Sequence, residues 1–328
     1  MAADFSITVP SRDVRTAIRD LTGADPGFDI GADAFSAMLG LAISEDLDPI
    51  VPSVLLARFA ADTVARRSHD RYSYFVDTPQ FAADTDCTAL ASSALYEHGS
   101  LSAAGLGSAA KELLKAATPR GDVGSAYGHR PGQGEVRPGV VTVYWDDDVD
   151  PRAAMRGRKY DPVVCANALY TLALAQDAGV LDRNTEVPWA TARYVEDHLA
   201  SPDLSGTRYY PDPHAFLFAV SRLCGRFDAY AELFGRDLGR HFARKWAQAP
   251  GNPLSVAQLI LTAYNLGFPA EALEGRLRVL ALSQRTDGSW PAATYYRMGR
   301  YPVYFGSPLV TTLFAVRALQ EPHRMERP

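Results

Sequence analysis

Short polar turns recur along this chain, and they constrain its fold more than any other feature of the sequence. The turns are rich in Asp, Gly and aromatic residues, and each precedes an apolar stretch that a small polar residue or Asp opens. The four turns begin at Asp70, Asp122, Asp203 and Asp287. Self-similarity of this kind is typical of helix-hairpin repeats, in which each hairpin buries its apolar face against the next one.

The apolar residues between the turns follow a helical period, and they predict 12 helices. The predicted helices cover residues 11–21, 33–43, 52–67, 84–97, 106–117, 161–177, 187–200, 212–224, 229–247, 253–266, 270–283 and 307–320. Six such hairpins in a ring make an all-α (α/α)6 barrel, in which inner and outer helices alternate. We therefore expect residues 1–328 to form a single domain with this fold.

The inner helices of such a barrel all begin at one end, which we call the mouth. On this count they begin near Asp33, Asp84, Asp161, Asp212, Pro253 and Ser307. Helix N-termini present unpaired N–H groups and the positive end of the helix dipole, so they attract anionic ligands and polar side chains. We therefore expect the functional site of the protein to lie at the mouth.

Residues 118–160 interrupt the helical pattern, because Gly and Pro are frequent there. Within them, residues 140–145 read Val-Val-Thr-Val-Tyr-Trp, the one clear β-type run of the sequence. A loop of this length in a compact domain is usually functional or disordered. We expect an inserted flap that contains a short strand and lies over or beside the mouth.

The composition limits the classes of partner and compartment. A net charge of -5 gives no basic footprint, so nucleic acid is not expected as a partner. The three cysteines form no C-x-x-C pair, which argues against a disulfide framework and fits a reducing cytoplasm. No apolar stretch approaches the ~18 residues of a transmembrane helix, and the first residues lack the pattern of a secretion signal.

Asp84 and Asp86 stand at the start of one predicted inner helix, ahead of an apolar run. Asp is a common N-cap, and the helix dipole favours a carboxylate in the first turn, so capping alone is one explanation of both residues. Their position at the mouth makes them catalytic candidates as well, together with Cys87. Candidates for substrate binding are Asp161, Cys165, Asn167, Asp212, His214, Thr311, Tyr296 and Trp145.

Two motifs carry a resemblance to a known superfamily. Residues 284–290 read Gln-Arg-Thr-Asp-Gly-Ser-Trp and match a Q-x-x-D-G-S-W repeat, and residues 84–89 read Asp-Thr-Asp-Cys-Thr-Ala, which is similar to D-x-D-D-T-A. Together with the hairpin pattern, they resemble the superfamily of squalene cyclases, class II terpene cyclases and protein prenyltransferases. This resemblance implies a terpene-cyclase-like enzyme that cyclises an isoprenoid or polyene by protonating it.

The resemblance also implies roles for individual residues. Asp86 takes the position of the proton donor, and Asp84 is its neighbour. Cys87 stands where the family motif has a further Asp. Trp290 belongs to a motif that is structural in the family, where it ties neighbouring helices together. No cofactor is implied, and the small-molecule substrate is of the isoprenoid type.

Two metal-dependent functions remain as alternative hypotheses. Prenyltransferases of the superfamily use an Asp, Cys and His zinc site, and Asp86, Cys87 and His214 offer these ligand types. Residues 146–150 read Asp-Asp-Asp-Val-Asp and fit the D-D-x-x-D pattern of magnesium-dependent terpene synthases. A short acidic run is usually a solvated surface feature, and we interpret residues 146–150 in this way.

Two further alternatives involve no isoprenoid chemistry. The chain could be a non-catalytic barrel that binds an apolar ligand or a protein, or a glycoside hydrolase that pairs Asp86 with Asp161 or Asp212 across the mouth. Because class II cyclases of the family place their acid motif against a second barrel, the single barrel expected here also raises the possibility of a homodimer or a partner subunit that covers the pocket.

Overall fold

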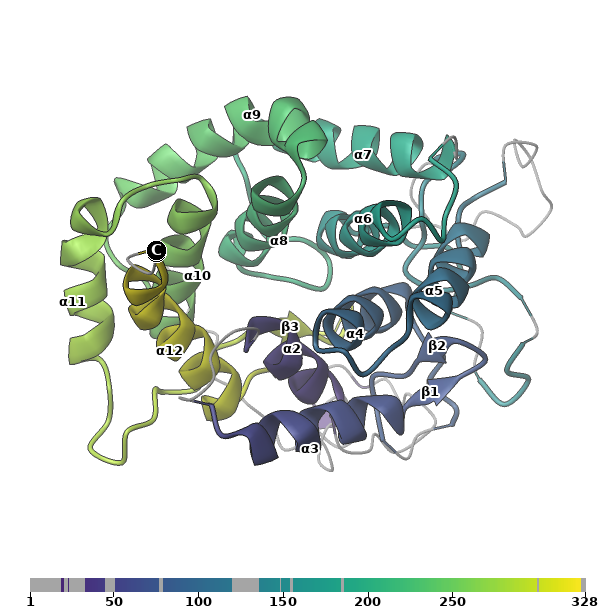
Figure 1. The fold of residues 1–328 in the computed structure, drawn as a ribbon, viewed down its shortest axis with the longest axis horizontal. Helices are drawn as coiled ribbons and strands as arrows, with labels where there is room; N and C mark the ends of the chain where they lie inside the picture. The colour runs from purple at the N-terminus through teal and green to yellow at the C-terminus, as the bar shows by residue number, and fades with distance from the viewer. Residues whose placement is uncertain are drawn as a thin grey trace. The chain divides into compact units, whose positions relative to one another are not determined.

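The computed structural model describes residues 19–20, 23, 33–44, 51–76, 79–119, 136–147, 149–153, 156–183, 186–299 and 301–325. Eleven α-helices lie in this part of the chain, accompanied by two pairs of two-residue strands (Figure 1). The predicted all-α class is therefore confirmed. The chain divides into two compact units, one of residues 31–45 and 52–198 and the other of residues 1–30, 46–51 and 199–328, which we call the 31–198 unit and the 199–328 unit.

The 31–198 unit is built around helix α4, whose residues from Thr85 to Leu95 are all buried. A helix that is buried on every side lies inside its domain. Helices α2, α5 and α6 pack against α4. The elements of the unit are α2 Phe35–Ile43, α3 Ser53–Val64, β1 Arg67–Ser68, β2 Arg71–Tyr72, α4 Thr85–Glu97, α5 Ala103–Lys115, α6 Pro162–Asp177 and α7 Glu186–Leu199.

The 199–328 unit repeats this pattern around helix α10, which is buried from Leu254 to Tyr264 and packs against α8 and α12. Helix α9 buries only one face, because its buried residues recur at helical spacing from Phe234 to Phe242. The elements of the unit are α8 Pro213–Arg226, α9 Asp228–Trp246, α10 Pro253–Asn265, the 3-10 helix η2 Ala270–Leu273, α11 Glu274–Leu282, β3 Tyr296–Arg297, β4 Tyr304–Phe305 and α12 Pro308–Met325.

The predicted helices agree with the structure wherever the structure describes them, apart from shifts at their ends. The helix expected at residues 106–117 begins earlier, because Ser102 caps α5 by accepting a hydrogen bond from the N–H of Gly105. The helix expected at residues 270–283 starts as the 3-10 helix η2 before α11. The helix expected at residues 11–21 lies almost wholly outside the described residues.

The strand expected at residues 140–145 is wrong. Val141 forms an isolated antiparallel bridge with Ala117, and no strand follows it within the described part of the insert. The backbone groups of Val143 are used elsewhere, because its C=O accepts from the N–H of Thr85 and its N–H donates to the C=O of Lys159. A β-type sequence forms no strand when its backbone partners are a helix terminus and a loop.

The Q-x-x-D-G-S-W motif joins α11 to α12. The indole N–H of Trp290 donates to the C=O of Leu280 at 2.8 Å, and its backbone N–H donates to the hydroxyl of Thr312 at 3.0 Å. Gly288 adopts a φ of 83°, a left-handed conformation that Gly enters at little cost. The side-chain amide of Gln284 donates to its carbonyl at 2.8 Å. The motif therefore has the helix-tying role that the resemblance implies.

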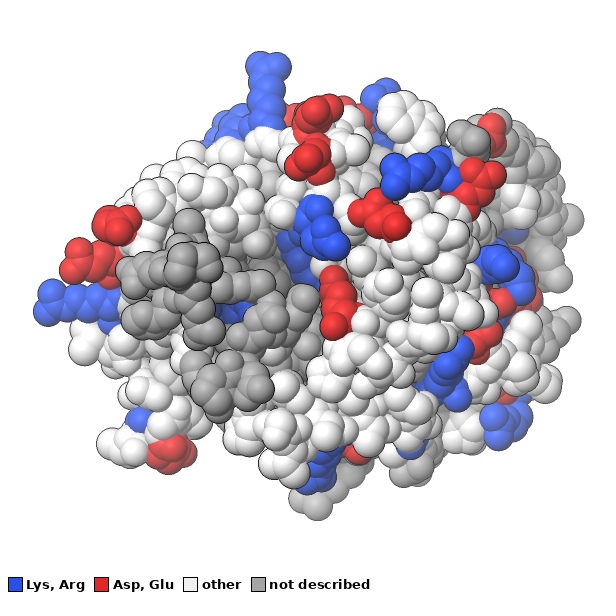
Figure 2. All heavy atoms as spheres, viewed as in Figure 1, with Lys and Arg blue, Asp and Glu red and all other residues white. Residues whose placement is uncertain are grey.

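Charged side chains of both signs are interspersed on the described surface that Figure 2 draws, with uncharged areas between them. Among the helices of the described residues, none is both long enough and apolar enough to cross a lipid bilayer.

Candidate active site

Residues 84–89, which are similar to the D-x-D-D-T-A motif and which we call the acid motif, lie at the N-terminus of α4. Asp84 caps this helix. Its carboxylate accepts a hydrogen bond from the backbone N–H of Cys87 at 2.7 Å. The same cap recurs at Asp161 of α6 and Asp212 of α8, each of which is followed by a Pro in the first turn. Asp and Pro in these two positions favour a helix start, which is why the sequence located these helices correctly.

Asp86 lies in the first turn of α4, where it meets a polar side chain of α6. The amide Nδ2 of Asn167 donates to Oδ1 of Asp86 at 2.8 Å, and both side chains are buried. Helices α4 and α6 pack directly against each other, so this contact is fixed by two rigid elements. The structure thus brings together two residues that the sequence nominated from separate helices.

A third carboxylate, Asp33, and a tyrosine, Tyr74, lie with Asp84, Asp86 and Cys87 in one cluster, which we call the acid cluster. Asp33, which precedes the N-cap residue Ala34 of α2, accepts a hydrogen bond from the N–H of Phe35 at 2.6 Å. Tyr74 is buried, and its pKa is raised by burial and by the charges of Asp33, Asp84 and Asp86. The sequence placed Asp33 at a helix start and Tyr74 in a turn but nominated neither for the site, because their approach to Asp86 depends on how α2 packs against α4.

Burial dominates the electrostatics of this cluster. It raises the pKa of Asp84 to about 6, against the lowering effect of hydrogen bonds from the backbone and thiol of Cys87. Burial also raises the pKa of Asp33 and that of the Cys87 thiol. Carboxyl groups in a desolvated cluster favour their protonated form. Cys87, which replaces an Asp of the family motif, is a neutral hydrogen-bond donor here.

Aromatic rings extend from the acid cluster in a row of successive contacts. Phe35 stacks on Tyr74 with ring centroids 5.3 Å apart, Tyr74 contacts Phe75 at 4.6 Å, and Phe75 contacts Phe81 at 4.8 Å. Tyr144 of the insert follows Phe81 at 6.4 Å. Aromatic faces attract positive charge, so this row suits a reaction that passes through a cation.

We compared the chain with protein families and with known proteins. No family model matches the chain. The drimenol cyclase drtB of Aspergillus calidoustus is 32% identical over 189 residues, which are 55% of this chain and 31% of that protein. The chain therefore spans only about a third of that relative.

Solved structures give the fold. The type II terpene cyclase MstE from Scytonema aligns with 96% of this chain and 98% of its own at a TM-score of 0.66 and 14% identity. The ent-copalyl diphosphate synthase from Streptomyces platensis aligns with 88% of this chain and 50% of its own at a TM-score of 0.57 and 14% identity. The chain therefore shares the fold of these cyclases, and the predicted barrel class is confirmed.

The insert contacts the acid motif at the start of α4 directly. The N–H of Thr85, one of the donors that a helix N-terminus leaves unpaired, is satisfied by the C=O of Val143 at 3.0 Å. The hydroxyl of Thr85 donates to the C=O of Thr142 at 2.7 Å. The described part of the insert is thus hydrogen-bonded to the first residue of α4.

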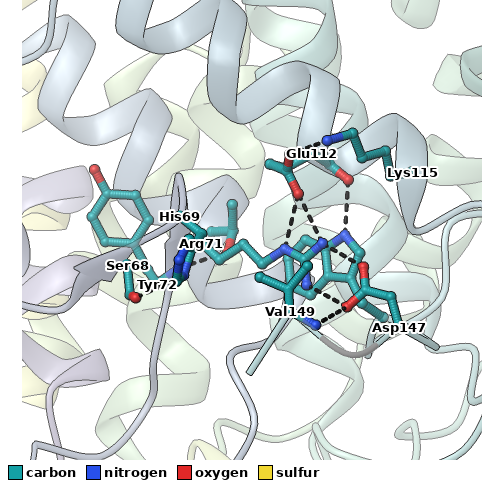
Figure 3. Close-up of polar contacts among 10 residues, drawn as sticks. Ser68, His69, Arg71, Tyr72, Glu112, Lys115, Asp147 and Val149 are labelled. Carbon is teal, nitrogen blue, oxygen red and sulfur yellow. Dashed lines mark hydrogen bonds and ion pairs between the residues drawn. The ribbon is translucent and has the colours of Figure 1, made fainter. Parts of the chain in front are cut away.

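Trp145 lies in a structural cluster around Arg71 of β2. The guanidinium of Arg71 is 4.2 Å from the centroid of the Trp145 ring and forms two hydrogen bonds to Asp147, at 2.9 Å and 2.6 Å. It also contacts Glu112 of α5, which pairs with Lys115 in turn (Figure 3). The indole N–H of Trp145 donates to the C=O of Glu112 at 2.9 Å.

The acidic run of the insert is held by arginines. Asp147 pairs with Arg71, Asp146 lies 3.5 Å from Arg158, and Asp150 lies 3.3 Å from Arg152. Asp148 is outside the described residues. Within the part of the chain that the structure describes, no group of three or more His, Cys, Asp or Glu is arranged to hold a metal ion.

Cys165 of α6 packs against the insert. Its sulfur lies 3.5 Å from the C=O of Val141, and the side chain is buried. Asp161 accepts from the N–H of Val163 at 3.0 Å as the cap of α6. Burial raises the pKa of the Cys165 thiol, so Cys165 is a neutral buried group rather than a reactive thiolate.

The remaining candidates lie in the 199–328 unit. Asp212 accepts from Nδ1 of His214 at 2.5 Å and from the hydroxyl of Ser255. Burial raises the pKa of Asp212, but the hydrogen bonds from His214 and Ser255 outweigh burial, so the pKa lies below its usual value. Tyr296 stacks on Tyr209 with centroids 5.9 Å apart. Thr311 is buried and donates to the C=O of Ser307 at 3.3 Å.

Proposed function

We propose that this protein catalyses the acid-initiated cyclisation of an isoprenoid or polyene substrate, with Asp86 as the proton donor. The observation that carries the proposal is the buried Asp86 carboxyl, oriented by Asn167 at 2.8 Å next to a second buried carboxyl, Asp84. The likeness to a drimenol cyclase and to type II terpene cyclases supports the same chemistry.

The proton step follows from this geometry. Protonation of an alkene needs a carboxylic acid that is neutral before the reaction, and burial beside a second carboxyl favours the neutral form. The O–H bond of Asp86 breaks as a C–H bond forms, the π bond supplies the electron pair, and a carbocation remains on the substrate. A second alkene of the substrate then attacks this cation and closes a ring.

The aromatic row from Phe35 to Tyr144 is the proposed stabiliser of the cation. A desolvated aromatic face contributes about 2 kcal/mol or more to the binding of a cation. Other proposed substrate contacts are Asp161, Cys165, Asp212, His214, Thr311 and Tyr296. The proposed proton step uses no metal. We further propose a cytoplasmic protein of one domain. In this proposal residues 118–160 form a flap over the substrate pocket, and a second subunit is another candidate for covering it.

The substrate proposal draws on the substrate of a structurally similar enzyme. A variant of MstE, aligned with 96% of this chain at a TM-score of 0.65 and 13% identity, is complexed with geranylgeranyl dihydroxybenzoate, its substrate. The test substrates are therefore farnesyl diphosphate, geranylgeranyl diphosphate and geranylgeranyl dihydroxybenzoate. Each is incubated with purified protein in buffer with EDTA and in buffer with Mg²⁺, and products are identified by mass spectrometry.

Asp86→Asn tests the acid directly. Asn keeps the size of the side chain but has no transferable acidic proton, so turnover is expected to fall by at least about 10³-fold while folding is retained. The matched control is Asp70→Asn, in an exposed turn, which is expected to keep wild-type turnover. Full activity of Asp86→Asn, or a cyclisation that EDTA abolishes, would contradict the proposal.

A further inference from the structure

Arg156 of the insert brings a cation to the acid cluster, where its charge acts on Asp84. Its guanidinium lies 4.1 Å from the centroid of Phe81 and 5.6 Å from that of Tyr144. Among the described residues, it forms no ion pair and its guanidinium donates no hydrogen bond, whereas Arg152 and Arg158 of the same segment pair with Asp150 and Asp146.

Arg156 is held in this position by more than its aromatic contacts. Its backbone C=O accepts a hydrogen bond from the ammonium group of Lys159, and the C=O of Lys159 accepts from the N–H of Val143 at 2.8 Å. Val143 in turn accepts from the N–H of Thr85 at the start of α4. The backbone of Arg156 is therefore connected through Lys159 and Val143 to the N-terminus of α4, and the contacts with Phe81 and Tyr144 place its guanidinium.

We propose that Arg156 is a positioning residue for the proton: its charge keeps Asp84 ionised, so that the proton which Asp84 and Asp86 compete for resides on Asp86. This inference rests on the proposed function of Asp86 as the acid. Two carboxyls in one desolvated site resist simultaneous ionisation, and the proton goes to the one whose anion is less stabilised.

The surroundings of Asp84 agree with that role. The groups that interact with it are Asp86 and Cys87 of α4, Tyr74 after β2, and Arg156 of the insert. Asp33 before α2 interacts with Tyr74 and Cys87 of the same cluster. Arg156 is the cation among these groups. Asp84 also accepts a hydrogen bond from the backbone N–H of Cys87 at 2.7 Å. The charge of Arg156 lowers the pKa of Asp84, although burial still raises it to about 6. At neutral pH Asp84 is thus mostly ionised.

An anionic substrate group is the other use for an unpaired guanidinium. In a linear isoprenoid with an anionic head, however, the alkene that begins the cyclisation lies at the opposite end of the molecule. A head group bound at Arg156, beside the acid cluster, would hold that alkene away from Asp86. The geometry therefore favours a role of Arg156 toward Asp84 over substrate binding.

The first test reads the proton directly and needs no substrate. Protein labelled with ¹³C at the Asp carboxyl carbons is titrated by NMR, and the Asp84 signal is assigned by its loss in Asp84→Asn. Arg156→Met keeps the apolar contact with Phe81 but removes the charge, and it is expected to raise the pKa of Asp84 by about one unit. Arg156→Lys is expected to stay near wild type.

Arg158→Met is the matched control. It removes the same charge only two positions along the chain, but from an arginine that pairs with Asp146. It is expected to leave the titration of Asp84 unchanged. An Asp84 titration that does not move in Arg156→Met, or that moves equally in Arg158→Met, would overturn the inference whether or not Asp86 proves to be the acid.

The second test uses turnover. Arg156→Met is expected to lower kcat about two- to fivefold at neutral pH with little change in KM, because about one pKa unit of competition changes the ratio of protonated Asp86 to protonated Asp84 about tenfold. In an Asp84→Asn background, the same substitution is expected to change kcat less than about twofold, since the competitor is gone. A large rise in KM, or full additivity of the two substitutions, would contradict the role and favour binding of a substrate anion. Failure of the proposed function is visible separately, as retained turnover in Asp86→Asn.

Discussion

At the scale of single residues, Asp84 has two opposed effects on stability. As the N-cap of α4 it satisfies the N–H of Cys87, and a good cap contributes about 1 kcal/mol. Its burial, however, raises its pKa to about 6, from a value of 3.8 in an unfolded chain. The folded state therefore binds a proton more tightly than the unfolded state, and this contribution to stability falls as pH rises from about 4 to about 6.

Substitutions at Asp84 separate the two effects. Asp84→Asn keeps a good cap and removes the charge, so it is expected to unfold with a free energy about 1–3 kcal/mol higher than wild type at pH 7.5 and equal to it near pH 4. Asp84→Ala loses the cap and is expected to fall about 1 kcal/mol below Asp84→Asn at both pH values. Urea denaturation at the two pH values measures these differences. A wild-type protein that is more stable than Asp84→Asn at pH 7.5 would show that Asp84 gains more from its partners than burial costs.

The residues of the site differ in how far the sequence could reveal them. Asp84 and Asp86 are local features, since capping chemistry depends on neighbours within one turn. Asn167, 81 positions away, donates a hydrogen bond to Asp86. The sequence nominated Asn167 for substrate binding, from its place near the start of an inner helix, and did not predict this contact. Asp33 and Tyr74 were missed, because a turn sequence does not tell which helix its side chains will face.

At the scale of elements, the insert is fastened by an ion pair as well as by hydrogen bonds to α4. Arg71 joins β2 to Asp147 of the insert and to Glu112 of α5, and it is almost completely buried. Its hydrogen bonds lower the pKa of Asp147. The ionised form of Asp147 is thus favoured by folding, so this stabilisation is present above about pH 4 and is lost as pH falls below it.

Arg71→Met is expected to lower the free energy of unfolding by about 3 kcal/mol at pH 7, because it removes the partner of Asp147 and leaves Glu112 paired with Lys115 alone. The difference from wild type should shrink in acid, as Asp147 becomes protonated. Arg67→Met is the matched control: Arg67 pairs with Asp70 at an exposed site, where an ion pair contributes about 0–1 kcal/mol. Denaturant unfolding at pH 7 and pH 3.5 tests both variants. Equal losses in the two variants would mean that the Arg71 cluster does not anchor the insert.

The insert also marks the limit of prediction from local pattern. Residues 140–145 have the composition of a strand, but their backbone groups bond to Ala116, Thr85 and Lys159, which belong to three different segments. A helix closes its hydrogen bonds within itself, so the apolar period located α4, α6 and α10 with ends correct to about one residue. Strand formation depends on a partner that the sequence does not specify.

At the scale of the whole molecule, the repeat of helix hairpins implies a chain whose parts depend on one another. A hairpin in a repeat fold buries its apolar face only against its neighbours. MstE aligns with 96% of this chain and 98% of its own, so the shared fold extends over both units. We therefore predict that residues 1–328 unfold as one cooperative domain, although the chain divides into two compact units.

One substitution in each unit tests this prediction. Gly206 lies in the turn before α8, and a Cβ added there would stand 1.9 Å from the carbonyl oxygen of Pro211, a backbone atom. Gly206→Ala must displace that turn, so we expect a loss of several kcal/mol, within the range of strained core substitutions of roughly 1–5 kcal/mol. Gly235→Ala, on α9 with open space around the added Cβ, is the control and is expected to be neutral or slightly stabilising.

Calorimetry of Gly206→Ala in the 199–328 unit and of Arg71→Met in the 31–198 unit then decides between one domain and two. A single domain requires one transition that both substitutions move to lower temperature, with equal calorimetric and van't Hoff enthalpies. Two domains would give two transitions, of which each substitution moves only its own, and the single-domain prediction would be wrong. Cooperative unfolding would also mean that a substitution far from the acid cluster weakens the helices that hold Asp86 and Asn167, so that activity and global stability would fall together on heating.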